Sequence, residues 1–285
     1  MSGSLVGYVN GEYVELFEAK VDALDRGYIF GDGIYEVIAI ENGSLFQLEE
    51  HLERYEQGAK EMLFENYPSP AAIKNICLRL QEKNRIKKGI IYFQVTRGTS
   101  PRTHAFPKET SPNIFMFADK IDDPDEEKRT KGVKAILVPD ERWDRCHVKS
   151  INLLPNCFYK EKAKRSGAFE AIQVCQYGVS EGTSTNVFGV KDNIIFTAPV
   201  GKKVLSGITR NTVLQLAREN GLKVEEKFLS EEKLLDSDEI FITSTTIKLL
   251  PVKQINNVKF PVSRYEVTFL LQKKLSDFIQ RKTRS

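Results

Sequence analysis

The chain has 285 residues, of which 41% are hydrophobic and 28% are charged. These values are typical of a globular protein with one or two domains, and they exclude a disordered or fibrous chain. The 42 basic and 39 acidic residues leave a formal net charge of only +3, so we expect no nucleic-acid partner. No apolar run approaches the roughly 20 residues that a membrane-spanning helix needs, and the first residues do not resemble a secretion signal.

The four cysteines show no CxxC pair and no spacing typical of a disulfide framework. Cys146 and His147 are adjacent, but no second pair of metal ligands follows at a suitable spacing, so we expect no metal site. Reduced thiols and the absence of a targeting signal favour a cytoplasmic protein.

The first half of the chain carries strand patterns and then helix patterns. Hairpins are expected over 5–16 and 34–48, because each contains an Asn-Gly pair that suits the two positive-φ positions of a type I′ turn. The elements expected next are a helix through Leu52, Tyr55, Ala59 and Met62, a helix through Ile73, Ile76, Cys77 and Leu80, and strands at 89–95 and 113–118.

A charged, proline-containing stretch at 119–132 suits an exposed linker. We therefore predict an α+β fold with a small N-terminal domain at 1–120, an interdomain linker at 121–132 and a larger, strand-rich C-terminal domain at 133–285. The elements expected after the linker are strands at 133–139, 170–175, 186–191, 194–197 and 239–243, a helix at about 210–220 that ends at Gly221, and a last helix that begins at Ser263 with a capping box to Glu266.

Several polar segments lie where a plain core or loop does not need them. Three glycines in 25–33 indicate a tight turn or a close approach, and a structural loop explains that segment by itself. Arg102 and His104 share one face of an extended segment and could hold an anion, although solvated surface charges explain them equally well in isolation. Lys149 lies in an apolar run, where a lysine either extends to solvent or becomes a nucleophile.

Small hydroxyl residues occur in three further segments, 181–186, 206–210 and 243–246. The second is expected at the start of a helix, where free N–H groups and small side chains can bind one phosphate. Each of these signals is weak alone, because loops rich in serine and threonine are common.

Taken in order, these segments resemble the class IV aminotransferases, the pyridoxal-phosphate enzymes of fold type IV. The resemblance runs from Asp25-Arg26-Gly27 to Thr243-Ser244-Thr245-Thr246, which is nearly the full length. The stretches that carry it are Arg26-Gly27-Tyr28-x-Phe30-Gly31-Asp32-Gly33-x-Tyr35-Glu36-Val37, Tyr92 to Pro107 with Arg102-x-His104, and Lys149-Ser150-x-Asn152-Leu153-Leu154. The middle stretch is long and resembles the subgroup that acts on D-amino acids.

The resemblance implies a cofactor, pyridoxal 5′-phosphate, in a cleft between the two domains. Lys149 matches the lysine that forms a Schiff base with it, and Glu181 matches the acid that pairs with the pyridine nitrogen. The further cofactor contacts that the resemblance implies are Arg54, Ile208, Thr209, Ser244 and Thr245 at the phosphate and Leu205 against the ring.

Tyr35, Arg102 and His104 match the residues that bind the substrate α-carboxylate in the D-specific subgroup. The implied reaction is ping-pong transfer of an amino group from a D-amino acid such as D-alanine to a 2-oxo acid such as 2-oxoglutarate, by a homodimer. A relative acting on branched-chain L-amino acids or on aminodeoxychorismate is the alternative, and it should lack the Arg102-x-His104 pair. A non-catalytic protein that binds a phosphorylated ligand is a second alternative, disfavoured by the presence of Lys149 and Glu181.

Overall fold

The computed structural model describes residues 5–283, which divide into two compact units. The first contains the described residues up to Asp122, the segment Val148–Asn152 and the end of the last helix from Lys282. The second contains Asp123–His147 and Leu153–Arg281. The sequence had assigned all of 133–285 to the second domain, whereas contacts group Val148–Asn152 with the first unit. The stretch expected as a linker holds a short helix, α4 (Glu126–Lys131).

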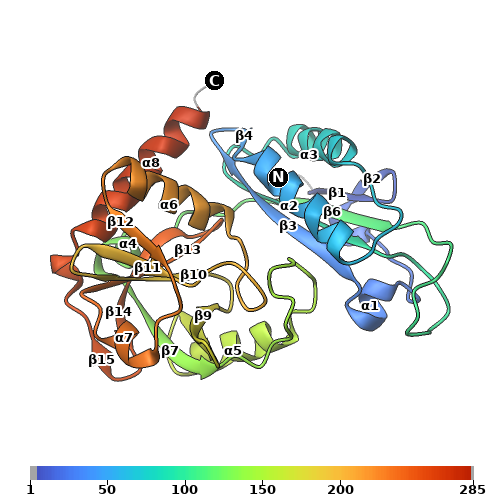
Figure 1. Ribbon diagram of the computed structural model, residues 1–285. Helices are drawn as coiled ribbons and strands as arrows, with labels where there is room; N and C mark the ends of the chain where they lie inside the picture. The colour runs from blue at the N-terminus through green and yellow to red at the C-terminus, as the bar shows by residue number, and fades with distance from the viewer. Residues whose placement is uncertain (1–4, 284–285) are drawn as a thin grey trace. The chain divides into compact units, whose positions relative to one another are not determined.

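The described part of the first unit forms a six-stranded antiparallel sheet in the order β2-β1-β6-β5-β3-β4 (Figure 1). Its strands are β1 (Val6–Val9), β2 (Glu12–Glu15), β3 (Gly33–Glu41), β4 (Ser44–Leu45), β5 (Gly89–Thr96) and β6 (Asn113–Asp119). Its helices are the 3-10 turn η1 (Leu16–Glu18), α1 (Arg26–Phe30), α2 (Leu48–Glu61) and α3 (Pro70–Asn84).

Helices α2 and α3 cover one face of this sheet (Figure 1). Residues on β5 alternate between buried and half-buried, as expected for a strand that packs one face against helices. The core between these layers includes Ile38, Leu52, Ile73, Phe93 and Met116, each 2% exposed or less. Both predicted hairpins and both predicted helices are confirmed.

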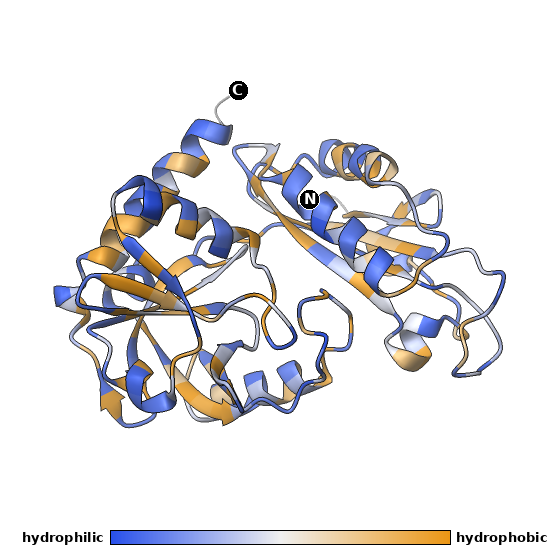
Figure 2. Cartoon of the chain, in the orientation of Figure 1, coloured by the Kyte–Doolittle hydropathy of each residue, from blue (hydrophilic) through white to orange (hydrophobic). Residues whose placement is uncertain are grey.

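The described part of the second unit forms a nine-stranded mixed sheet in the order β12-β11-β10-β13-β14-β7-β8-β9, with β15 paired to β14. Figure 2 shows apolar residues concentrated along these strands. The strands are β7 (Val133–Pro139), β8 (Glu170–Cys175), β9 (Gly178–Gly182), β10 (Asn186–Lys191), β11 (Ile194–Thr197), β12 (Lys223–Glu226), β13 (Glu239–Ser244), β14 (Lys248–Ile255) and β15 (Val258–Lys259). Its helices are α4, α5 (Leu154–Arg165), α6 (Ile208–Glu219), α7 (Glu231–Leu235), η2 (Val262–Arg264) and α8 (Val267–Thr283). The α+β prediction is therefore confirmed.

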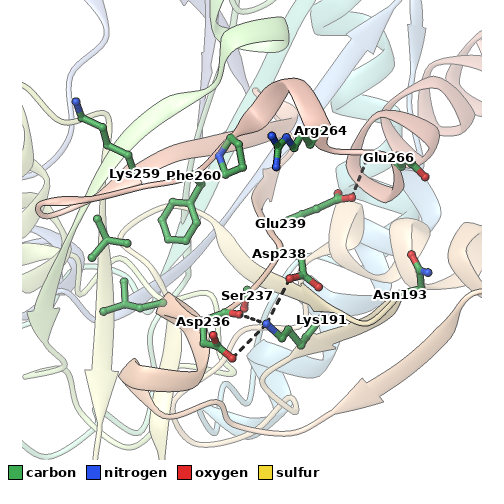
Figure 3. Close-up of a pocket in the computed structure, with 13 residues that line it drawn as sticks. Lys191, Asn193, Asp236, Ser237, Asp238, Glu239, Lys259, Phe260, Arg264 and Glu266 are labelled. Carbon is green, nitrogen blue, oxygen red and sulfur yellow. Dashed lines mark hydrogen bonds and ion pairs between the residues drawn. The ribbon is translucent and has the colours of Figure 1, made fainter.

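Glu239 on β13 caps the last helix, α8. Its carboxylate accepts hydrogen bonds from the backbone N–H groups of Glu266, Val267 and Thr268 at 2.7, 2.9 and 2.7 Å (Figure 3). The predicted start at Ser263 was wrong, because η2 occupies that position and α8 begins at Val267. A buried carboxylate from a distant strand satisfies the free N–H groups that a capping box was expected to satisfy.

Candidate functional site

Lys149 lies on a short segment that pairs with the first residues of β3. The backbone N–H of Tyr35 donates to the carbonyl of Lys149 at 2.9 Å, and the N–H of Ile151 donates to the carbonyl of Gly33 at 3.0 Å. A Cβ atom at Gly33 would lie only 2.9 Å from Ile151 Cδ1, so glycine permits this close approach. The pairing explains why Val148–Asn152 belongs to the first unit although the chain on either side of this segment belongs to the second.

The Lys149 side chain is half-buried beside the ring of Tyr35. Its Nζ atom lies 4.2 Å from the centre of that ring, which is cation–π distance. The Tyr35 ring stacks in turn on Tyr92, with ring centres 5.7 Å apart. The structure thus brings two predicted site residues together.

Arg54, the predicted phosphate ligand, is held by a buried carboxylate. Its Nε donates to Glu36 Oε1 and its Nη2 donates to Glu36 Oε2, both at 2.7 Å. The Nδ1 atom of His51 lies 2.7 Å from the same Oε2 atom. Sequence reasoning missed Glu36 and His51. The available signals were the spacing of His51 and Arg54, which lie one turn apart on α2, and the alternation along β3, which points Glu36 to the helix side of the sheet.

The charges in this cluster are fixed by its burial and pairing. Burial alone raises the pKa of Glu36, but the positive charge of Arg54 and the hydrogen bonds from Arg54 and His51 outweigh it and lower that pKa to about 2. Burial lowers the pKa of His51, and Glu36 only partly opposes this shift. The cluster at neutral pH is therefore an ionised glutamate, a neutral histidine and a charged arginine.

Arg102 and His104 lie on the exposed loop between β5 and β6. The guanidinium carbon of Arg102 is 5.4 Å from the centre of the Phe30 ring, and the His104 ring is 5.6 Å from the same ring. The structure therefore places these two predicted carboxylate ligands beside one shared neighbour. Among the described residues, no contact joins Tyr35 to either of them.

Glu181, the predicted partner of the pyridine nitrogen, is buried on β9. Its Oε1 accepts a hydrogen bond from Arg142 Nη1 at 2.5 Å, while its Oε2 accepts bonds from Asn186 Nδ2 at 3.2 Å and from the backbone N–H of Leu205 at 3.0 Å. Burial raises the pKa of Glu181 above its ordinary value, and the charge of Arg142 with the hydrogen bonds from Arg142 and Leu205 opposes that shift only in part. Three donors, one of them charged, nevertheless favour the ionised form over that of an unpaired buried carboxyl group.

Arg142 was missed by the sequence reasoning, and it is fixed from several sides. Its Nε and Nη2 donate to the two oxygens of Asp140 at 2.9 and 2.8 Å, and Nη2 also donates to the carbonyl of Lys203 at 2.9 Å. Ser180 Oγ donates to Asp140 at 2.8 Å. Pairing with Asp140 and Glu181 raises the pKa of Arg142 in spite of its burial, so the guanidinium stays charged. The sequence signal that could have revealed Arg142 is its spacing from Asp140, Asp-x-Arg, directly after β7.

The predicted phosphate residues Ile208 and Thr209 open helix α6. Gly207 is the N-cap residue of this helix, and no side chain caps its N–H groups. A Cβ atom at Gly207 would lie 2.0 Å from Asn186 Oδ1, so any other residue there would displace the Asn186 amide. An uncapped start of a 12-residue helix offers N–H groups and a positive dipole end to an anion.

The other two predicted phosphate residues lie at the end of β13, where Ser244 is the last residue of the strand and Thr245 follows it. This strand pairs with β10, with Asn186 opposite Thr243. Asn186 Nδ2 also donates to the carbonyl of Leu205 at 3.0 Å. Asn186 therefore joins the Glu181 carboxylate and the turn before α6 to the end of β13. The N–H and hydroxyl donors suit a phosphate, and the Glu181 carboxylate can accept a hydrogen bond from a protonated ring nitrogen.

The pocket drawn in Figure 3 is a different part of the second unit. None of the predicted site residues lines it. Lys191 Nζ lies 3.2 Å from the Asp236 carboxylate and 3.3 Å from that of Asp238, and Glu239 is engaged with α8. Lys191, Asp236, Asp238 and Glu239 are thus engaged within the protein, and we assign no ligand to this pocket.

No helix within residues 5–283 is long and apolar enough to cross a bilayer. No cluster of three or more His, Cys, Asp or Glu side chains there is arranged to hold a metal ion.

The Glu36 cluster predicts a pH-dependent stability. A carboxylate with a pKa of about 2 in the folded chain and 4.5 as its ordinary value stabilises the fold above pH 4.5 by about 3 kcal/mol, and this contribution is lost as the pH falls toward 2. Glu36→Gln should therefore be destabilised at pH 7, with the difference from wild type shrinking by about 2 kcal/mol at pH 3. Urea unfolding at both pH values measures this. Glu53→Gln, an exposed neighbour of Arg54, is the control, and a difference independent of pH would contradict the assignment.

The Arg142 cluster predicts a large loss on removal of its cation. Arg142→Met leaves Asp140 and Glu181 as buried carboxylates without a charged partner, which should cost about 3–5 kcal/mol in the free energy of unfolding. Arg145→Met, an exposed arginine in the same loop, should cost less than about 0.5 kcal/mol. The double variant Asp140→Asn/Arg142→Met should recover part of the loss. Equal stability of the two single variants would show that Arg142 does not hold these charges.

The chain matches the family model described as amino-transferase class IV over residues 33–255. It is 46% identical over 247 residues to a D-alanine aminotransferase of Bacillus licheniformis, with 87% of each chain covered. It is 37% identical over 278 residues to a D-alanine aminotransferase of Staphylococcus haemolyticus, with 97% of this chain and 98% of that protein covered.

The fold is also similar to that of solved structures. A branched-chain amino acid aminotransferase of Escherichia coli superposes with a TM-score of 0.90 at 25% identity, covering 99% of this chain and 97% of that chain. A 4-amino-4-deoxychorismate lyase of Pseudomonas aeruginosa superposes with a TM-score of 0.84 at 24% identity, covering 95% and 98%. The matched motifs and the two buried carboxylate clusters agree with what these relatives show. The chain belongs to the class IV aminotransferases, the pyridoxal-phosphate enzymes of fold type IV.

Proposed function

We propose that this chain transfers the amino group of a D-amino acid, such as D-alanine, to a 2-oxo acid, such as 2-oxoglutarate. The observation that carries the proposal is the pair Arg102 and His104, presented side by side against Phe30, in a chain that is 46% identical to a D-alanine aminotransferase. The branched-chain aminotransferase structures resemble the chain in fold but at 22–25% identity.

The residues of each unit fit pyridoxal phosphate. Lys149 offers an amine for its carbonyl carbon, Arg54 offers a guanidinium for its phosphate, and Glu181 offers a carboxylate for its ring nitrogen. The remaining contacts that we propose are the α6 start with Ile208 and Thr209, the hydroxyl groups of Ser244 and Thr245, and Leu205 against the ring. The bound cofactor supplies an electron sink for the electron pair left when the substrate Cα loses its proton.

Each buried arginine–carboxylate pair contributes differently. Glu36 fixes Arg54 through two parallel hydrogen bonds, so the guanidinium is oriented before an anion arrives. Arg142 and the other donors to Glu181 favour its ionised form, which would keep a proton on the ring nitrogen of the bound cofactor. The Nζ atom of Lys149 would hold and move the proton that the substrate Cα gives up.

The position of the α-carboxylate decides between D- and L-substrates. Only the Cα–H bond perpendicular to the ring and on the side of Lys149 can break, because only that bond overlaps the π system. Arg102 can bind a carboxylate through two parallel N–H bonds, and His104 and Tyr35 can each add a donor. A fixed carboxylate therefore determines which enantiomer presents its hydrogen to Lys149.

We also propose that the enzyme is a cytoplasmic homodimer whose partners are small amino acids and 2-oxo acids. The first unit exposes several large apolar side chains, as expected of a surface that another subunit covers. The most exposed are Phe17, Tyr28, Leu63 and Val21. The cysteines of the described chain are free thiols, which suits a reducing compartment.

The proposal predicts a clear choice of enantiomer. With 2-oxoglutarate as acceptor, D-alanine should react at least roughly 100-fold faster than L-alanine, because the L-form holds its Cα–H bond away from Lys149. Arg102→Ala should raise KM about 10- to 100-fold for both amino acid and oxo acid, since each presents the same carboxylate. Lys108→Ala, an exposed cation in the same loop, should leave both constants unchanged. Initial rates for the two alanine enantiomers decide the matter, and equal rates or a preference for L-alanine would move the chain to the branched-chain subgroup.

A further inference from the structure

Arg26, in the glycine-rich segment 25–33, is among the most buried charged residues of the first unit. It is 2% exposed and opens the short helix α1. Its Nε donates to Asp32 Oδ2 at 2.7 Å, and Arg97 Nε donates to the same oxygen at 2.9 Å. Two arginines therefore share one buried carboxylate, and a structural loop alone does not require this expensive arrangement.

The outer end of Arg26 binds the backbone of the loop that carries Arg102 and His104. Its Nη1 donates to the carbonyl of Thr103 at 2.7 Å and lies 3.5 Å from the carbonyl of Ala105, while Nη2 lies 3.5 Å from the carbonyl of His104. Three successive carbonyl groups thus converge on one guanidinium. The loop has no helix or strand of its own at these residues, so this cation replaces the hydrogen bonds that regular structure would supply.

A ring at the end of the same loop packs on this cluster. Phe106 lies with its centre 3.6 Å from the guanidinium carbon of Arg97 and 5.7 Å from that of Arg26. Arg97 is itself fixed, because its Nη1 and Nη2 donate to the carbonyls of Leu63 and Met62 at 2.8 and 2.7 Å. The loop is therefore held both by its carbonyl groups and by an aromatic side chain.

We propose that Arg26, supported by Asp32, Arg97 and Phe106, is a positioning residue for substrate binding. It holds the backbone at 103–105 so that the Arg102 and His104 side chains stand together beside Phe30. Because the exposed loop would otherwise sample many conformations, fixing it before substrate arrives lowers the entropy cost of binding the carboxylate. This inference rests on the proposed function, in which Arg102 and His104 bind that carboxylate.

The geometry requires arginine at position 26. A planar guanidinium can donate from Nε to Asp32 and from its two terminal nitrogens to carbonyl groups at once, whereas the single ammonium group of lysine cannot span these partners. Arg26→Lys keeps the positive charge opposite Asp32 and removes only the hold on the loop. It therefore separates positioning from charge balance.

The test compares Arg26→Lys with wild-type holoenzyme in three measurements. We expect KM to rise about 10-fold for both D-alanine and 2-oxoglutarate, with kcat changed less than about 3-fold, because only carboxylate binding is impaired. We expect the cofactor content, read from the visible absorbance of the purified protein, to be unchanged. We also expect trypsin to cleave after Arg102 about 10-fold faster, which reports loop mobility without any turnover.

Two further variants make each outcome decisive. Arg85→Lys, an exposed arginine at the end of α3, should match wild type in every measurement. Phe106→Leu, at a half-exposed position that tolerates substitution, should raise both KM values about 3-fold. This variant provides the test if Arg26→Lys fails to fold. Unchanged KM and unchanged cleavage in the folded variants would overturn the inference. If Arg102→Ala also leaves KM unchanged, the carboxylate assignment itself fails; if Arg102→Ala raises KM and the Arg26 and Phe106 variants do not, only the positioning role fails.

Discussion

The backbone pairing between Val148–Asn152 and the start of β3 determines where Lys149, the lysine that we propose is reactive, lies. Two hydrogen bonds, from Tyr35 to Lys149 and from Ile151 to Gly33, attach this segment to the first unit. Lys149 is thereby paired with Tyr35 on β3. Glu36, the next residue of β3 after Tyr35, holds Arg54. A lysine on a free loop would lose side-chain and backbone freedom on binding a cofactor, whereas this one has already been fixed by folding.

The same logic governs the two buried carboxylates. Glu36 and Glu181 are removed from water, and a buried charge is tolerated only with a charged, hydrogen-bonded partner. Arg54 with His51 supplies that partner in the first unit, and Arg142 with Asp140 supplies it in the second. These clusters cost desolvation energy that well-packed apolar residues would not, so their presence favours a role in orienting groups for catalysis over a role in stability alone.

Much of this arrangement could be predicted from the sequence, and the rest depended on contacts between distant residues. Asn-Gly turns and helical periodicity are local signals, so the hairpins and helices of the first half were predicted correctly. The start of α8 was not, because the carboxylate that caps it comes from Glu239 on a distant strand. Motif matching predicted Lys149, Glu181 and Arg54 as site residues, but it did not point to Glu36, His51 and Arg142, which hold Arg54 and Glu181 in the structure. It also could not show that Arg26 binds the loop that carries Arg102 and His104.

Reduction of the holoenzyme with borohydride tests whether Lys149 is the lysine that binds the cofactor, because reduction converts a lysine–cofactor bond into a stable one that survives digestion. The chain loaded with pyridoxal phosphate is reduced, digested and mapped by mass spectrometry, with Lys149→Ala treated in parallel. We expect one pyridoxyl group per chain, on Lys149, and no specific label in the variant. A stoichiometric label on any other lysine would contradict the placement of the reactive amine on the segment paired with β3.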